Sequence, residues 1–359
     1  MNKHIHISSY PSVILICLFL VVALAGFRVE KPATPYTLPE LRYFPPLPVT
    51  NNPPTIEGVD LGRHLFYDPI LSVDSSLSCA HCHRQEAAFS DAPKKFSTGI
   101  RQTPMKRNTM PLFNLAWYPA FFWDGRAADL ESQVFQPVRA HDEMDLDWET
   151  AVQRIAGNTF YRARFRSVFG SVQIDSNLVA KAIAQFERVL ISNRSRYDSV
   201  LARKAYFTPE ESEGFRIVND QSKGDCLHCH PTDAQALGTT GQFSNNGLDA
   251  FTRPEQFTDP GRGGVSNLAK DTGLFRIPSL RNIALTAPYM HDGRFQTLEE
   301  VIDFYSEGVH ASYNIDSKMQ YAYRHGVHFT AEDKAQVLAF LKTLTDSAFI
   351  TDPAFGNPW

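Results

Sequence analysis

The chain has 359 residues and a formal net charge of −4, with 43% apolar residues, 20 glycines and 23 prolines. At roughly 100–200 residues per domain, this length predicts two domains. The near-neutral charge gives no general attraction to nucleic acid, and we expect no nucleic-acid partner. Because the chain also has 26 phenylalanines to bury, its composition excludes collagen-like, coiled-coil and disordered proteins.

Residues 1–25 have the pattern of an export signal. An apolar run from Val13 ends at Ala23-Leu24-Ala25, an A-x-A cleavage pattern, and it is shorter than the roughly 20 residues of a membrane span. We therefore expect removal of residues 1–25 and a periplasmic protein, with an uncleaved membrane anchor as the alternative. Cys17 lies in this segment, so four of the five cysteines remain in the mature chain.

Residues 26–54 are predicted to form a proline-rich arm, and regular structure is expected from Thr55. Beyond the arm, apolar side chains recur every three or four residues, which predicts amphipathic helices over 148–155, 178–190, 298–305 and 337–344. Thr208 and Thr330 each precede acidic residues and predict helix starts. Alternating strand patterns are scarce, so the predicted fold is mainly α.

Four cysteines fall in two copies of a C-x-x-C-H motif, at residues 79–83 and 226–230. This motif is the attachment signature of c-type haem, in which both thiols form thioethers with the porphyrin and the histidine ligates the iron. The predicted attachment residues are Cys79, Cys82 and His83 in the first motif and Cys226, Cys229 and His230 in the second. His81 and His228 are interpreted as spacers. The alternatives are a zinc site, a redox dithiol or, in an exported chain, two disulfides.

The distance between the motifs predicts an internal duplication of a unit of roughly 150 residues. We predict two tandem cytochrome c-like helical domains, each with one covalently bound c-type haem. The N-terminal haem domain is predicted over residues 55–205 and the C-terminal haem domain over 206–359.

Further motifs carry a resemblance that covers nearly all of the mature chain, from about Thr55 to Thr345. The sequence resembles the bacterial di-haem cytochrome c peroxidase family. Beside the haem motifs, the resemblance rests on the segments Arg107-Asn108-Thr109, Phe122-Trp123-Asp124-Gly125-Arg126-Ala127, Leu130-Glu131-Ser132-Gln133, Phe275-Arg276-Ile277-Pro278-Ser279-Leu280-Arg281-Asn282 and Pro288-Tyr289-Met290-His291-Asp292-Gly293-Arg294.

The resemblance implies roles for three residues in peroxide chemistry. Glu143 matches the family's distal glutamate, which moves a proton between the peroxide oxygens, and Gln133 matches the distal glutamine that orients the oxidant. Trp123 matches the tryptophan that relays electrons between the haems. From the residues alone, Glu143 could equally be a solvated acid in a polar run, and Trp123 a core residue.

The resemblance also implies two further binding sites. Asn108, Thr286 and Pro288 match the residues that hold a calcium ion between the domains, through one side-chain oxygen and two backbone carbonyls. A turn-capping asparagine is the alternative interpretation of Asn108. Arg262 is interpreted as the partner of a haem propionate, because a guanidinium can bind a carboxylate through two bonds.

Two features depart from the peroxidase pattern. The segment 96–106 has no histidine where typical members carry one that blocks the N-terminal haem iron, and Met105 is its only conventional soft ligand. We therefore expect a five-coordinate or water-bound N-terminal haem. Tyr305 occupies the usual position of the methionine ligand of the C-terminal haem, as in the MauG branch of the family, with Met290 and Met319 as alternative ligands.

The predicted function is reduction of hydrogen peroxide to water with electrons from a small periplasmic cytochrome or copper protein. The first alternative is a MauG-like oxidase that uses peroxide to modify a partner protein. The second is an electron carrier without substrate chemistry. A homodimer is compatible with the resemblance.

Overall fold

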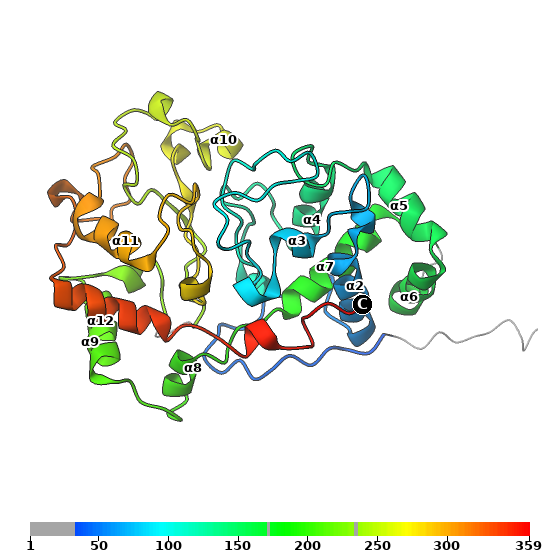
Figure 1. Ribbon diagram of the computed structural model, residues 1–359, viewed down its shortest axis with the longest axis horizontal. Coiled ribbons are helices and arrows are strands. Elements are labelled where there is room, and N and C mark those ends of the chain that lie inside the picture. Colours follow the sequence, from blue (N-terminus) through cyan, green and yellow to red (C-terminus); the bar gives the residue numbers. More distant parts are fainter. Residues whose placement is uncertain (1–32, 171–172, 233–235) are drawn as a thin grey trace, which may run out of the picture.

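The computed structural model describes residues 33–170, 173–232 and 236–359. It is mainly helical, as predicted, and its helices form two groups that lie side by side (Figure 1). The first group contains α2 (Ile56–Tyr67), α3 (Cys79–Cys82), α4 (Leu130–Arg139), α5 (Trp148–Gly157), α6 (Thr159–Phe169) and α7 (Ser176–Val189). The second contains α8 (Arg196–Leu201), α9 (Pro209–Asn219), α10 (Gly263–Ser266), α11 (Leu298–Asp303) and α12 (Ala331–Lys342). Strands β1 (Phe243–Ser244) and β2 (Phe275–Arg276) pair in antiparallel fashion.

The predicted helix starts at Thr208 and Thr330 are confirmed, and regular structure begins at Thr55 as expected. The Thr55 side chain accepts a hydrogen bond from the backbone of Gly58 at the start of α2. Thr208 and Thr330 form capping boxes with Glu211 and Asp333 at the starts of α9 and α12. Each box satisfies backbone N–H groups that have no partner within the helix, so these short sequence patterns define where the helices begin.

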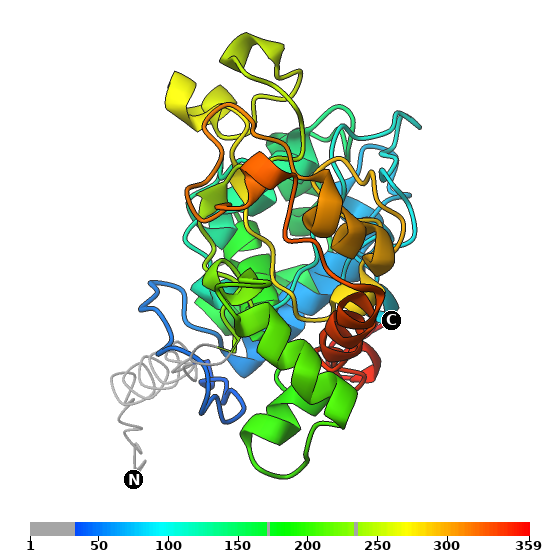
Figure 2. The same cartoon turned by 90° about the vertical axis from the view of Figure 1, so that its left-hand side faces the viewer.

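In each group, a long helix pair packs closely around one glycine. A Cβ atom on Gly62 in α2 would collide with the backbone carbonyl of Ala182 in α7. Likewise, a Cβ atom on Gly214 in α9 would collide with the carbonyl of Gln336 in α12. The pair α9 and α12 runs along one side of its group in Figures 1 and 2. The same type of close contact thus recurs in both halves of the chain.

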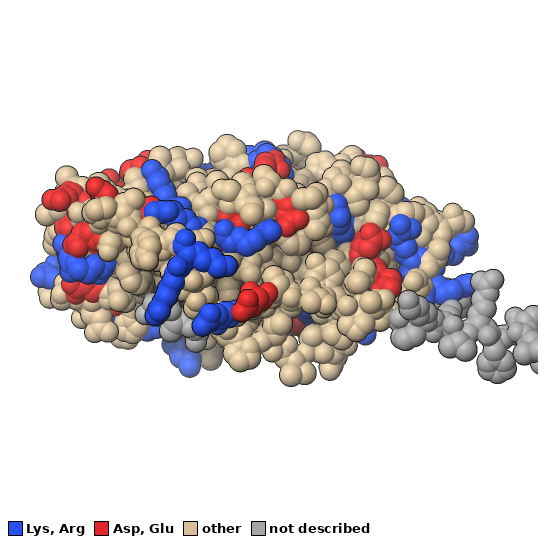
Figure 3. All heavy atoms as spheres, turned by 90° about the horizontal axis from the view of Figure 1, so that it is seen from below, with Lys and Arg blue, Asp and Glu red and all other residues tan. Residues whose placement is uncertain are grey.

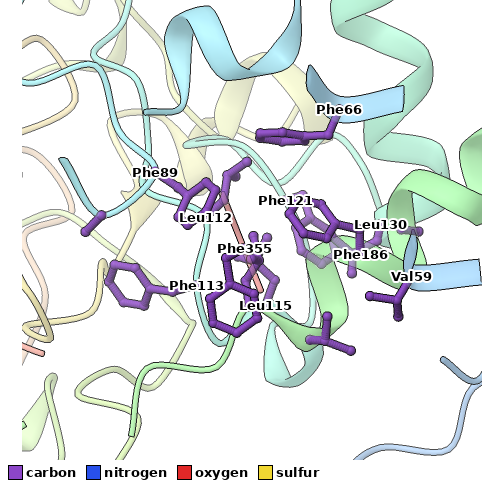
Figure 4. Packing of buried hydrophobic residues seen from close by; sticks show 14 of the residues in the cluster. Val59, Phe66, Phe89, Leu112, Phe113, Leu115, Phe121, Leu130, Phe186 and Phe355 are labelled. Atoms are coloured by element: carbon purple, nitrogen blue, oxygen red, sulfur yellow. The ribbon is translucent and has the colours of Figure 1, made fainter. Parts of the chain in front are cut away.

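Aromatic side chains fill the core of the first group. Phe66 of α2, Phe186 of α7 and Phe89 pack together in Figure 4, and each has no exposed surface. The last residues of the chain join this core, because Phe349 and Phe355 belong to the same cluster. The C-terminal tail therefore packs on the first group, although the predicted domain boundary assigns it to the second.

Hydrogen bonds to backbone carbonyls hold the C-terminal tail against the first group and the N-terminal arm against both groups. In the tail, the Tyr67 hydroxyl donates to the carbonyl of Phe355 at 2.8 Å. In the proline-rich arm, the Trp117 indole donates to the carbonyl of Pro45 at 3.0 Å, and the Ala236 N–H donates to that of Tyr43 at 2.9 Å. Within residues 33–54, the arm is therefore bound to both groups.

The surface carries both signs of charge. Figure 3 shows acidic side chains at several places on one face and basic side chains gathered in a band left of centre. No helix within the described residues is long and apolar enough to cross a membrane. The predicted export signal, residues 1–25, lies outside the described residues.

The burial of Phe349 predicts a stability effect of the tail. Replacing Phe349 with Ala should lower the free energy of unfolding by about 3–5 kcal/mol, because it leaves a cavity in the core of the first group. Urea unfolding of the haem-loaded protein, followed by circular dichroism, measures this change. Val49→Ala in the fully exposed part of the arm is the control. Equal unfolding midpoints for the two variants would show that the tail does not stabilise this core.

Candidate haem sites and the junction between them

The first C-x-x-C-H motif presents its histidine in a fixed orientation. Cys79 and Cys82 lie in the single turn of α3, and His83 follows directly. The Nδ1–H of His83 donates to the backbone carbonyl of Phe89 at 2.8 Å. Burial lowers the pKa of His83, so the ring is neutral. A neutral ring with Nδ1 bound in this way leaves Nε2 to ligate a metal.

The second motif repeats this arrangement with different surroundings. The Nδ1–H of His230 donates to the backbone carbonyl of Pro278 at 2.9 Å. Burial lowers the pKa of His230 to about 4. The middle histidines of both motifs are bound locally instead: Nδ1 of His81 accepts from the Ser78 N–H at 3.0 Å, and Nδ1 of His228 lies 3.3 Å from a carboxylate oxygen of Asp225. These contacts fit the interpretation of His81 and His228 as spacers.

The cysteines of both motifs are free thiols, so the disulfide alternative finds no counterpart in the structure. Within the described ranges, no group of three or more His, Cys, Asp and Glu side chains is placed to hold a metal ion, which leaves the zinc alternative without a ligand set. Two thiols and one oriented, neutral imidazole in each motif fit a covalently attached haem.

A cavity in the second half has the second motif on its wall. Its lining includes Cys226, Cys229 and His230 together with the three proposed iron ligands Tyr305, Met290 and Met319. Tyr305 lies in a π-helical turn, Phe304–Gly308, a local conformation that is frequent at functional sites. The Asn246 amide donates to the Tyr305 hydroxyl at 3.0 Å and lies 3.8 Å from the Met290 sulfur. Burial raises the pKa of Tyr305 to about 12.

Glu143 is a half-buried acid near the first motif. Burial, reinforced by the charge of Asp142, raises its pKa to about 7. Burial is also the main cause that raises the pKa of the Cys79 and Cys82 thiols, and the charge of Glu143 adds to it for both. Glu143 therefore lies close enough to act electrostatically on both attachment cysteines.

The segment without a histidine packs directly on Glu143. The Ile100 N–H donates to the backbone carbonyl of Glu143 at 2.8 Å. Gln133 is half-buried on α4, the helix that precedes Glu143.

Trp123 belongs to the first half but lies on the wall of the cavity in the second. Its indole N–H donates to the carbonyl of Asn108 at 2.8 Å, and its own carbonyl accepts from the Arg276 N–H at 2.8 Å. The Asn108 N–H in turn donates to the carbonyl of His291 at 2.8 Å. A short chain of backbone contacts thus joins the two halves around this indole.

The proposed calcium ligands lie at the same junction. The Asn108 amide nitrogen donates to the carbonyl of Lys95 at 3.0 Å, so the amide oxygen takes no part in that bond. A Cβ atom on Gly293 would lie 3.1 Å from Lys95 and 3.3 Å from Pro288, so these segments meet there. The Thr286 hydroxyl is 3.4 Å from the carbonyl of Ile283.

Arg262, the proposed propionate partner, lies beside the tryptophan segment. Its guanidinium donates to the carbonyl of Asp124 at 3.2 Å and lies 4.4 Å from the centre of the Phe243 ring.

Two buried charged side chains were not identified from the sequence. Glu187 lies on α7 and has a carboxylate oxygen without a hydrogen-bond partner. Burial raises its pKa to about 8, and its charge acts on Cys79. The sequence does contain a signal for Glu187, because this acid lies on the apolar face of the predicted helix 178–190. Arg276 is also buried and lines the cavity. It lies in a segment that carries the family resemblance, but nothing in that segment predicts its burial.

Residues 56–206 match the family model described as di-haem cytochrome c peroxidase. The chain is 34% identical to the methylamine utilization protein MauG of Methylorubrum extorquens over 84% of this chain and 82% of that protein. It is 32% identical to cytochrome c551 peroxidase of Nitrosomonas europaea over 82% of this chain and 81% of that protein. The chain belongs to the di-haem cytochrome c peroxidase family. Membership implies two c-type haems, one for each C-x-x-C-H motif.

Solved structures agree with this fold. A MauG-like protein associated with microbial copper homeostasis superposes with a TM-score of 0.81 at 34% identity, covering 90% of this chain and 99% of that one. The diheme peroxidase BthA of Burkholderia thailandensis superposes with a TM-score of 0.71 at 22% identity over 92% of this chain and 96% of its own, a likeness of fold alone. Cytochrome c peroxidases and MauG proteins thus both occur among the relatives of this family member.

Proposed function

We propose that this family member reduces hydrogen peroxide to water with electrons from a small cytochrome or copper protein of the periplasm. The observation that carries the proposal is Glu143, a half-buried acid whose pKa is raised to about 7 beside the first haem motif. The relative from Nitrosomonas europaea, a cytochrome c551 peroxidase, supports it. When bound at Cys79, Cys82 and His83, the haem supplies a redox-active iron with an open coordination position.

Glu143 serves as acceptor and donor of one proton. Reduction of hydrogen peroxide consumes two electrons and two protons and yields two water molecules. Cleavage of the O–O bond is easiest when a proton leaves one peroxide oxygen and reaches the other, so that water and not hydroxide departs. A carboxyl group with a pKa near the working pH can accept and then donate this proton. Gln133 orients the peroxide by hydrogen bonding.

Access of peroxide depends on the segment 96–106. Because this segment offers no imidazole and packs against Glu143 through Ile100, we propose that the ferric N-terminal haem is five-coordinate or water-bound without prior reduction. Electron paramagnetic resonance of the as-isolated ferric protein tests this point. Two low-spin haems would contradict it.

The second haem and the junction complete the proposal. Cys226, Cys229 and His230 would hold the second haem, which would store the second oxidising equivalent, and Trp123 would relay electrons between the halves. Asn108, Thr286 and Pro288 hold a calcium ion at the junction, supported by the contacts that bring Asn108 and the Pro288 segment together. Metal analysis after dialysis against calcium would count this ion. Arg262 pairs with a haem propionate.

The second candidate function is a MauG-like oxidase that modifies a partner protein. Tyr305 favours it, because a tyrosinate ligand stabilises oxidised iron more than a thioether does. Two MauG relatives, at 34% and 29% identity, also support it. Turnover with reduced cytochrome c separates the two functions, since a peroxidase oxidises this donor rapidly and a dedicated oxidase does not. A carrier without substrate chemistry would have no use for an acid at Glu143 with a raised pKa.

Replacement of Glu143 with Gln should leave both haems attached and lower peroxide turnover by about 10² to 10⁴-fold, the usual contribution of a positioned acid or base. In the wild type, the turnover rate should rise with pH through about 7, as the carboxyl group loses its proton and becomes able to accept one from peroxide. The assay is peroxide-dependent oxidation of reduced cytochrome c.

Asp142→Asn is the matched control. It removes the neighbouring charge that helps to raise the pKa of Glu143, so the rising limb should move to lower pH while the maximal rate persists. Wild-type turnover in Glu143→Gln would contradict the assignment.

Replacement of Trp123 with Phe should slow electron transfer between the haems, because the oxidisable indole is lost while the aromatic packing remains. Rapid-mixing absorbance measures the rate after one haem is reduced. Trp117→Phe is the control, since its indole bonds to Pro45 and it is not part of the cavity lining. If electron transfer slows equally in both variants, Trp123 is a core residue and not a relay.

Replacement of Tyr305 with Phe should change the optical and resonance spectra of the C-terminal haem, because the phenolic oxygen is lost as a ligand. Tyr289→Phe is the matched control, since it removes another phenol from the cavity wall whose hydroxyl donates to the carbonyl of Ile283. Unchanged spectra in Tyr305→Phe would assign ligation to another residue, with Met290 and Met319 the next to test.

A further inference from the structure

Arg276 is a buried cation at the junction between the halves. It lies on β2, and only 4% of the residue is exposed. Burial lowers the pKa of Arg276, but a guanidinium remains protonated in proteins. The residue therefore keeps a full positive charge away from water.

The described surroundings of this charge contain no anion. One terminal nitrogen donates to the carbonyl of Ala120 at 2.9 Å, and the other lies 3.1 Å from the Met110 sulfur. The guanidinium carbon lies 4.3 Å from the centre of the Tyr118 ring. Burial raises the pKa of Tyr118, so this ring is neutral. The Nε–H of Arg276 has no hydrogen-bond partner at all.

Two other arginines are paired with carboxylates. Arg281, 1% exposed, forms a two-bond ion pair with Asp198. Arg107 bonds to Asp124 at 2.6 Å and to Asp259 at 2.7 Å. An unpaired buried charge is strongly unfavourable, whereas a paired one can be tolerated. Arg276 therefore requires an anion that the described side chains do not supply.

The position of Arg276 indicates where this anion comes from. Arg276 lines the same cavity as Cys226, Cys229 and His230. A c-type haem attached there brings two propionate carboxylates into the cavity. The unpartnered Nε–H and an adjacent terminal N–H form the fork that binds a carboxylate through two parallel bonds.

Met110 extends the influence of this charge to the first site. Its sulfur contacts the Arg276 guanidinium, and its backbone acts on the pKa of His83. The backbone N–H of Arg276 also donates to the carbonyl of Trp123 at 2.8 Å. Arg276 thus lies on the wall of the second site and, through Met110, contacts a residue whose backbone acts on His83 in the first.

We propose that Arg276 is the counter-cation of a propionate of the C-terminal haem and, through Met110, sets the relative reduction potentials of the two haems. Reduction adds one electron to a haem, so a buried positive charge nearby stabilises the reduced form and raises the potential. The effect is larger at the C-terminal haem, whose propionate Arg276 binds directly, and smaller at the N-terminal haem.

The test is a spectroelectrochemical titration of both haems in the loaded protein at several pH values. Arg276→Gln should lower the potential of the C-terminal haem strongly and that of the N-terminal haem less. In Arg276→Gln, the potential of the C-terminal haem should also fall with rising pH. The reason is that the propionate without its counter-cation takes up a proton when the haem is reduced. Tyr118 is the titratable side chain whose charge acts on Arg276, and its raised pKa keeps it neutral in this range.

Arg276→Lys keeps the charge and should retain a high potential that does not depend on pH. Its fork geometry is lost, so the propionate bending bands of the resonance Raman spectrum should shift. Arg253→Gln removes an exposed positive charge and should leave potentials and bands as in the wild type. If Arg276→Gln does not bind haem, the propionate bending bands of Arg276→Lys still test the proposal.

Wild-type potentials in Arg276→Gln, or unshifted propionate bands in Arg276→Lys, would overturn the proposal. None of these measurements uses peroxide, so their failure is distinguishable from a failure of the role proposed for Glu143.

Discussion

The structure depends on how the histidine of each C-x-x-C-H motif is bound. In both, the Nδ1–H donates to a backbone carbonyl, of Phe89 for His83 and of Pro278 for His230. One bond determines the tautomer, the ring orientation and the nitrogen that faces the metal. Because these carbonyls lie outside the motifs, each haem site needs its loop to fold back over it, and the short helices and loops of this fold serve that purpose.

Close packing between helices forms the framework that carries these loops. Gly62 and Gly214 allow two long helix pairs to approach at the backbone, one pair in each half. The C-terminal tail then crosses to the first half and completes its aromatic core with Phe349. The halves are consequently held together at their ends and at the Trp123 junction, which favours a constant distance between the two motifs, as the proposed electron transfer requires.

Charged side chains shielded from water lie near both motifs. Glu187 is buried and Glu143 half-buried near the first motif, and both have raised pKa values because burial disfavours their charged forms. Arg276 is a buried cation beside the second. Burial of these charges costs folding free energy, which the roles proposed for Glu143 and Arg276 would explain.

The sequence by itself predicted the haem attachment residues, and it determined the helix starts at Thr208 and Thr330 and the mainly α fold, because covalent attachment, capping and amphipathic periodicity depend on residues close in the chain. The resemblance added candidates such as Glu143 and Trp123. Only the tertiary structure decided that the tail packs on the first half, that Tyr305 and Met290 share one cavity wall, and that Arg276 is buried without an anion. Those facts depend on contacts between backbone and side-chain groups that are distant in the sequence, and no local sequence pattern predicts such contacts.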